Sequence, residues 1–298
     1  MAATGTVRIG ISGWRYPPWR GIFYPPKLPQ KRELAYAANI FRSIEINGTF
    51  YSLQRPEYFE AWAAETPDDF VFSVKGPRFI THIKRLKDVK VPLANFLASG
   101  VLRLGPKFGP ILWQFPPNFR FEPKKLETFL KMLPHDTEAA AALARRHDKR
   151  LSGRSALKTD AKRQLRHAIE IRHNSFVTPA FVQLLRKYDV ALVCADAVEW
   201  PRLMDLTSDF VYCRLHGSEQ LYASGYDQEA LDRWAARVAC WAQGKIPADA
   251  EQIIKGGPSE TQPRDVFVYF DNDTKVRAPF DAQGFMARIS EIGKRQPA

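Results

Sequence analysis

The sequence predicts a single parallel (β/α)8 barrel, an α/β fold of the TIM-barrel type, over residues 1–298. Three observations predict it. Eight short apolar segments are typical of strands, helical patterns separate most of these segments, and the length of 298 residues suits one large barrel.

The eight predicted strands are rich in β-branched, aromatic or Leu residues, and each is about six residues long. Continuous apolar character of this kind is typical of parallel strands that are buried on both faces. The predicted strands are Val7–Ser12, Phe41–Asn47, Phe70–Lys75, Pro110–Phe115, His167–Arg172, Val190–Ala195, Phe210–Leu215 and Asp265–Phe270.

The segments between these strands carry apolar residues at helical spacing. Proline is favoured at the start of a helix, where its missing N–H has no intrahelical partner, and Gly is favoured just after the end. Two predicted helices begin at Pro56 and at Pro179. Three others run from Pro123 to Pro134, from Asp227 to about Gly244 and from Phe280 to Ile292. A further helix has Leu93, Phe96, Leu97 and Val101 on one face.

Two connections depart from the regular pattern. The stretch Ala197–Ser208, between the sixth and seventh strands, is too short for a full helix, so we expect an irregular sixth crossover. The stretch His135–Arg166 is long, and we expect it to hold an inserted helix, Thr137–His147, and a basic loop before strand five.

Composition excludes several classes of protein. No apolar run approaches the ~18 residues of a membrane-spanning helix, and the first six residues lack the apolar segment of a signal peptide. Cys194, Cys213 and Cys240 are odd in number and form no C-x-x-C pair, which argues against a disulfide framework or a thiolate zinc site. We therefore expect a cytoplasmic protein without membrane partners.

Positive charge is concentrated in two stretches. The chain has 44 Lys and Arg against 32 Asp and Glu, a net charge of +12. Residues 75–90 hold six basic residues and one Asp, and residues 145–166 hold nine basic residues and two Asp. Basic patches favour polyanions, so these stretches predict nucleic acid as one candidate partner, with solvated surface as the alternative.

Polar side chains follow most of the predicted strands at their carboxyl ends, where barrels of this class place their active sites. Because strand side chains alternate, Arg214 and His216 oppose Cys213 and Leu215. The same alternation predicts one polar rim that contains Glu45, Asn47, Lys75, Gln114, Glu170, Arg172, Asp196, Arg214 and His216. In the last strand it does not decide between Asp271 and Asn272.

The rim has the residue types of an acid–base site. Glu45 and Glu170 are the candidate catalytic acid and base, since unequal burial would separate their pKa values, and His216 is the alternative proton carrier. Lys75, Arg172 and Arg214 would hold an anionic group. The other candidate ligand-binding residues are Trp14, Asn47, Gln114, His173, Asp196 and Asn272. A structural network of ion pairs is the alternative.

No cofactor is predicted from motifs. Gly10–Gly13 is not a dinucleotide fingerprint, and the sequence has neither a Walker loop nor H-E-x-x-H. Glu45, Glu170, His173, Asp196 and His216 have the donor chemistry for a divalent metal, but the three neighbouring cations argue against one.

Several ordered motifs resemble one known family. They are G-I-S-G-W-R-Y-P-P-W-R-G-I-F-Y-P from Gly10, E-I-N-G-T-F-Y from Glu45, F-V-F-S-V-K ending at Lys75 with I-T-H after it, Q-F-P-P from Gln114, E-I-R-H-N-S-F from Glu170, R-L-H-G from Arg214 and Y-F-D-N-D from Tyr269. The chain resembles the YecE-like family, also called domain of unknown function seventy-two. The resemblance implies a TIM-barrel fold and supplies no reaction. Asp271 stands where the family pattern has the first of two asparagines.

Three functions remain open from the sequence. The first is an enzyme, hydrolase or isomerase in type, that acts on a small anionic or sugar-like ligand at the rim. The second is a barrel that binds or processes nucleic acid through residues 75–90 and 145–166. The third is a barrel that binds a metabolite without turning it over.

Overall fold

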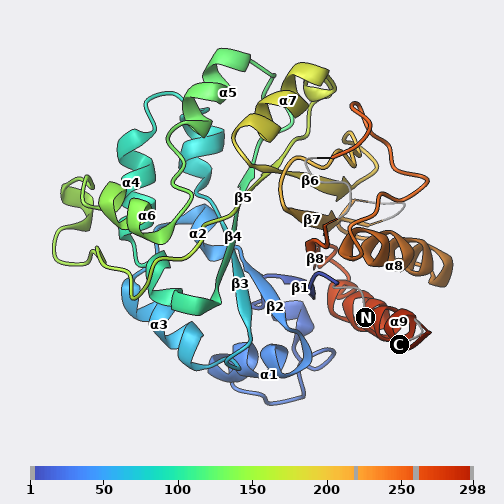
Figure 1. Cartoon of the computed structure of the whole chain (residues 1–298). Helices are drawn as coiled ribbons and strands as arrows, with labels where there is room; N and C mark the ends of the chain where they lie inside the picture. Colours follow the sequence, from blue (N-terminus) through green and yellow to red (C-terminus); the bar gives the residue numbers. More distant parts are fainter. Residues whose placement is uncertain (1–3, 218–220, 258–261, 296–298) are drawn as a thin grey trace. The chain divides into compact units, whose positions relative to one another are not determined.

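The computed structural model describes residues 4–217, 221–257 and 262–295 (Figure 1). Eight parallel strands follow one another around a closed barrel, in the order β1 to β8. The predicted (β/α)8 barrel is thereby confirmed. The strands are β1 Val7–Ser12, β2 Ser43–Ile46, β3 Val71–Lys75, β4 Phe108–Gln114, β5 His167–Glu170, β6 Ala191–Asp196, β7 Phe210–Leu215 and β8 Asp265–Phe270.

Along the chain, each helix of the described residues follows one of the strands. They are α1 Glu33–Ile40, α2 Gly48–Tyr51, α3 Pro56–Ala64, α4 Lys90–Ala98, α5 Pro123–Leu130, α6 Thr137–Ala144, α7 Pro179–Lys187, α8 Gln228–Ala242 and α9 Ala278–Arg295. The chain also forms short helical turns at Phe79–Ile83, Val101–Lys107 and Lys149–Leu151.

The chain divides into two compact units. Unit 1 comprises residues 1–44 and 177–298, and unit 2 comprises residues 45–176. In unit 1, β6, β7, β8 and β1 pair in that order, α9 packs against β1, and α8 lies beside α9 (Figure 1). In unit 2, β3, β4 and β5 pair, and α4 packs against α6. The single domain over residues 1–298 stays a prediction.

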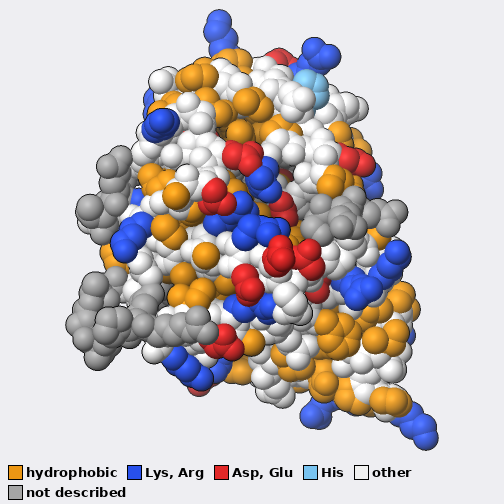
Figure 2. Space-filling model, turned by 90° about the vertical axis from the view of Figure 1, so that its right-hand side faces the viewer, with side chains coloured by type: hydrophobic (Ala, Val, Ile, Leu, Met, Phe, Trp, Pro, Cys, Tyr) orange, Lys and Arg blue, Asp and Glu red, His pale blue; other side chains and the backbone are white. Residues whose placement is uncertain are grey.

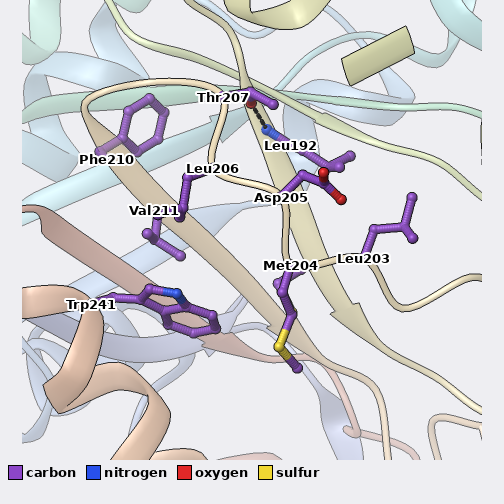
Figure 3. Close-up of a pocket in the computed structure, with 10 residues that line it drawn as sticks. Leu192, Leu203, Met204, Asp205, Leu206, Thr207, Phe210, Val211 and Trp241 are labelled. Atoms are coloured by element: carbon purple, nitrogen blue, oxygen red, sulfur yellow. Dashed lines mark hydrogen bonds between the residues drawn. The ribbon is translucent and has the colours of Figure 1, made fainter. Parts of the chain in front are cut away.

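The sixth crossover is irregular, as predicted. Residues 197–209, all of them described, contain no helix. Leu203, Met204 and Leu206 are buried instead and cover β6 and β7 where a helix would lie, and Thr207 fixes the segment by accepting a hydrogen bond from the Leu192 N–H at 2.8 Å (Figure 3). The cavity left beside Trp241 measures ≈ 10 Å³, about the space of one water molecule.

Several predicted boundaries were wrong. Val101 does not continue α4, because Gly100 adopts φ = 117° and ends that helix; a Cβ there would lie 2.5 Å from the Pro56 Cα. Helix α5 ends at Leu130, before Pro134, and the inserted helix α6 ends at Ala144 rather than His147. Two strands are shorter than predicted. The structure has β2 at Ser43–Ile46 rather than Phe41–Asn47, and β5 at His167–Glu170 rather than His167–Arg172. The amides of Ile111 and Phe115 donate to the Arg166 and Glu170 carbonyls, and Pro117, the next residue in this alternation, has no N–H to extend the pairing.

Candidate functional site

Strand register places Asp271 beside Arg214 in unit 1. In the pairing of β7 with β8, Arg214 aligns with Tyr269 and Leu215 with Phe270. Side chains that align across neighbouring strands share a face of the sheet, and residues two apart share it too. Asp271, two residues after Tyr269, therefore lies on the face of Arg214, which resolves the ambiguity of the sequence between Asp271 and Asn272.

These side chains form one buried polar cluster. Arg214 Nη2 donates to Asp271 Oδ2 at 2.7 Å and to Ser12 Oγ, at the end of β1, at 3.1 Å. His216 Nδ1 lies 3.2 Å from the same Asp271 Oδ2. The side chains of Arg214 and His216 have no exposed surface, whereas that of Asp271 is 11% exposed. Asp271 is therefore the member of this trio that solvent reaches.

A second carboxyl, that of Asp273, lies near this cluster. Burial and the neighbouring Asp271 charge raise the pKa of Asp273 to about 6, against the opposing effects of a hydrogen bond with Tyr16 and of the Arg214 charge. The Tyr16 hydroxyl donates its proton to the Ser12 carbonyl at 2.5 Å. Gly13, with φ = 85°, permits this approach, since a Cβ there would lie 2.8 Å from the Tyr16 Oη.

Aromatic rings enclose the buried end of the cluster. The Trp200 and Tyr222 rings meet His216 edge to face, with ring centroids 5.1 and 5.4 Å from that of the imidazole. These contacts hold the imidazole in place next to Asp271.

Two other predicted site residues of unit 1 have contacts outside this cluster, and a third is buried. Asp196 accepts hydrogen bonds from Trp234 Nε1 at 3.1 Å and Arg202 Nη1 at 3.3 Å. Asn272 Nδ2 donates to the Ser224 carbonyl and to Asp281 Oδ2. Trp14 is buried. Ligand binding by Trp14, Asp196 and Asn272 stays a prediction.

Unit 2 carries a separate polar cluster around Glu170. Glu170 Oε1 accepts from Gln114 Nε2 and from Arg172 Nε, both at 2.8 Å, and Arg172 Nη2 lies 2.8 Å from the same atom. Arg172 follows β5 rather than ending it, yet it still meets Glu170 as the alternation predicted. The Glu170 carboxylate is thus buried and bound by two predicted site residues.

Lys75 and His82 belong to the same region of unit 2. Lys75 Nζ lies 4.5 Å from the centroid of the Phe50 ring, and the His82 ring meets Phe50 edge to face. Burial and the positive charges of Arg172 and Lys75 lower the pKa of His82 to about 4. His82 is therefore held neutral near pH 7.

The remaining predicted site residues of unit 2 lie on β2, just after it and just after β5. Glu45 is buried, and Asn47, which directly follows β2, is partly buried. His173 Nδ1 lies 2.9 Å from Ser175 Oγ and accepts from the Ser175 N–H at 3.0 Å, which fixes the turn after β5. The catalytic role of Glu45 and the binding roles of Asn47 and His173 stay predictions.

The sequence reasoning assigned no role to Asp271 or Asp273. The motif Y-F-D-N-D shows two carboxyls after β8, but the alternation alone does not say which of its residues shares a face with Arg214. The signal that would have found Asp271 is the alignment of Tyr269 with Arg214.

The side of unit 1 that carries α8 and α9 shows no block of one sign of charge. Acidic and basic side chains are interspersed at the centre of the face in Figure 2. In unit 1, Arg237 pairs with Asp249 at 2.6 Å, Arg202 with Glu251, and Arg288 with Asp232. Both basic stretches singled out in the sequence lie in unit 2 instead.

The described residues contain neither a metal-binding cluster nor a membrane-spanning helix. No group of three or more His, Cys, Asp or Glu side chains in this part of the chain could hold a metal ion. None of the helices described has the length and apolar character needed to cross a bilayer.

Comparison with known proteins identifies relatives by sequence. A family model described as "Protein of unknown function DUF72" matches residues 8–298. The chain is 30% identical to UPF0759 protein YunF of Bacillus subtilis over 124 residues, which are 38% of this chain and 41% of that protein. It is 30% identical to UPF0759 protein YecE of Escherichia coli K12 over 131 residues, 43% of this chain and 44% of that protein. The match therefore spans about two fifths of the length of these curated relatives.

Solved structures resemble the chain over nearly its whole length. A DUF72 family protein from Thermotoga maritima superposes with a TM-score of 0.68 at 23% identity, covering 96% of this chain and 99% of that one. A DUF72 family protein from Enterococcus faecalis superposes with a TM-score of 0.69 at 16% identity, covering 96% of both chains. These likenesses show the fold.

Proposed function

The chain belongs to the DUF72 family, and from the cluster around Asp271 we propose that it is an enzyme that transfers protons to and from a small, hydroxyl-rich ligand. The observation that carries the proposal is a pair of carboxyls with different environments. Asp271 is bound to a buried guanidinium, while the pKa of Asp273 is raised to about 6. Environments that separate two carboxyls in this way are typical of acid–base sites.

The two carboxyls have distinct roles in this proposal. Arg214 stabilises the ionised form of Asp271, so Asp271 serves as the base. Asp273 is partly protonated near neutral pH, so it serves as the acid that donates a proton to a ligand oxygen. Arg214 and His216 are positioning residues, because both side chains are fully buried and contact Asp271 Oδ2 on its buried side.

Charge favours a sugar-like ligand over an anionic one at this cluster. The positive charge of Arg214 is already matched by Asp271, and Asp273 adds a second acidic group. An anion would meet repulsion here, whereas hydroxyl groups donate to carboxylates and accept from a protonated one. Tyr16, which is partly exposed, adds a ring edge and a hydroxyl beside Asp273.

This assignment differs from the acid–base pair favoured by the sequence. Glu170 Oε1 is surrounded by three donor nitrogens of Gln114 and Arg172. The Glu170 side chain has no exposed surface, whereas that of Asp271 is 11% exposed, which supports a holding role for Glu170. Hydrolysis and isomerisation both need a base and an acid, and the experiment below distinguishes them.

The test uses proton NMR of the protein in D2O with a panel of monosaccharides, disaccharides and aryl glycosides at pH 6. New product signals would indicate hydrolysis, and loss of C–H signals through deuterium uptake would indicate isomerisation. We expect one of these from the wild type and a loss of about 100-fold or more in Asp273→Asn and Asp271→Asn.

Asp232→Asn is the matched control, because Asp232 is an exposed carboxylate on α8 that pairs with Arg288. It should keep the wild-type rate. A wild type that turns over no member of the panel, or an Asp273→Asn variant as fast as the wild type, would overturn the proposal. Ligand binding without turnover would support the metabolite-binding alternative.

A further inference from the structure

A cavity in unit 2 is lined by none of the residues that bind Glu170, and Phe50, one of its lining residues, also contacts Lys75. It measures ≈ 190 Å³ and is lined by residues of α2, of the turn Phe79–Ile83, of the start of α4 and of the turn Lys149–Leu151. Both turns pack against α4. Phe50, Tyr51, Phe79, Asn95 and Arg150 are among its lining residues.

The cavity presents aromatic rings to solvent. Tyr51 is 71% exposed and Phe79 39% exposed, although both are large apolar side chains. The Phe50 ring beneath is buried and meets Tyr51 edge to face at 5.1 Å between centroids. Exposed rings beside a hollow can stack on the flat face of a planar ligand.

A guanidinium lies at the edge of the same cavity. The Arg150 Cζ is 6.0 Å from the centroid of the Phe79 ring, and Asp148 orients the guanidinium, with Asp148 Oδ2 2.9 Å from Nη2 and 3.0 Å from Nε. Arginine in this arrangement can stack on a base or bind a phosphate through its remaining N–H groups.

The two basic stretches of the sequence meet at this cavity. Phe79 and Ile80 belong to residues 75–90, and Arg150 belongs to residues 145–166. Exposed cations are neighbours of lining residues along the chain: Arg78 adjoins Phe79 and Lys149 adjoins Arg150. The acidic members of these stretches are Asp88, Asp148 and Asp160, against fifteen Lys and Arg.

We propose that this cavity binds one nucleotide unit, with its base against Phe79 and Tyr51 and its phosphate toward Arg150. Its volume lies below the ~300–1,000 Å³ of pockets for drug-sized ligands, so it suits a single ring system. The base must be unstacked to enter, which selects a free nucleotide or a single strand over a duplex. This site is independent of the acid–base cluster of unit 1.

The test measures fluorescence anisotropy of a labelled ten-residue deoxythymidine oligonucleotide, with AMP, ribose 5-phosphate and inorganic phosphate as competitors. We expect binding at ~50 mM salt that weakens as salt rises. Phe79→Ala should weaken it about tenfold, the scale of one stacked base. Arg150→Gln should weaken it and lower the salt slope by about 0.7, the loss of one phosphate contact.

Lys162→Gln is the matched control, because Lys162 is an exposed cation of the same basic stretch that does not line the cavity. Lys162→Gln should leave the stacking of the base on Phe79 intact, so Phe79→Ala should still weaken oligonucleotide binding in its presence. Tyr51→Ala provides a second stacking variant, and thermal melts verify that each variant is folded. Competition by AMP but not by ribose 5-phosphate would support a site that recognises free nucleotides, and competition by neither would support a site for a strand.

Two results would overturn the proposal. One is no binding of the oligonucleotide or of AMP by the wild type at ~50 mM salt. The other is equal weakening by Lys162→Gln and Arg150→Gln with no effect of Phe79→Ala or Tyr51→Ala, which indicates diffuse attraction to the basic surface rather than a site.

Discussion

Asp271 and Arg214 form a buried ion pair, with 2.7 Å between Oδ2 and Nη2 and no exposed surface on the arginine side chain. The pair joins the end of β7 to the residue that follows β8. A charge buried in this way is stabilised by its partner and is costly without it. The same pair positions the carboxylate that we propose as the base.

Removal of the guanidinium should therefore destabilise the fold strongly. We expect Arg214→Met to lower the free energy of unfolding by roughly 3–5 kcal/mol, because it leaves the Asp271 carboxylate without its partner. The double variant Arg214→Met with Asp271→Asn should recover a large part of that loss, since the stranded charge is gone. Urea unfolding measures both. A loss below about 1 kcal/mol in the single variant would show that the pair is not needed for folding.

His167 predicts how stability depends on pH. Its Nδ1 accepts from Trp113 Nε1 at 3.1 Å, and its Nε2 lies 2.8 Å from the Pro134 carbonyl, to which it donates as the neutral ring. Burial lowers the pKa of His167 to about 3. In the unfolded chain the His167 ring binds a proton near pH 6.5, whereas in the folded chain it does so only near pH 3. The contribution of His167 to stability is therefore full above pH 6.5.

We expect that contribution to fall by about 1.4 kcal/mol per pH unit between roughly pH 6.5 and pH 3. His167→Gln should show a smaller loss of stability from pH 6.5 to pH 5 than the wild type, by urea unfolding. Nitrogen-15 NMR should find the His167 ring neutral at pH 5, with the proton on Nε2. A ring that is protonated at pH 5 would contradict the account.

Lys107 should stabilise unit 2 through the end of α3. Its Nζ donates to the Ala63 carbonyl at 2.6 Å and to the Thr66 carbonyl at 2.7 Å, and its side chain is nearly buried. Lys107→Met should cost about 1–3 kcal/mol, because two carbonyls lose a charged donor. The exposed Lys131, 3.6 Å from Glu127, is the control, and Lys131→Met should change stability by less than about 0.5 kcal/mol. Equal effects in the two variants would refute this role.

Local patterns were enough to predict most elements of the barrel. Asp227 was expected to begin a helix, and its side chain accepts from the Ala230 N–H at 2.7 Å at the start of α8. The end of α4 escaped prediction because it depends on a contact distant in sequence: Gly100 leaves no room for a Cβ against Pro56. Helical spacing alone made Val101 look like the next turn.

The candidate site was only partly predictable for the same reason. Alternation placed Arg214 and His216 on one face, because it is a property of a single strand. The partnership with Asp271 depends on how β7 aligns with β8, and the raised pKa of Asp273 depends on its burial in the folded chain. Neither is encoded in the spacing of residues along one segment.

The central claim is that the Asp273 carboxyl keeps its proton to a higher pH than an ordinary aspartate, and carbon-13 NMR of the side-chain carboxyls tests it most directly. The Asp273 signal is identified by its absence in Asp273→Asn. We predict that this carboxyl titrates with a midpoint near pH 6, and that Asp271→Asn lowers the midpoint by removing the neighbouring negative charge. A midpoint at or below about pH 4, the ordinary value for an aspartate, would contradict the proposed acid.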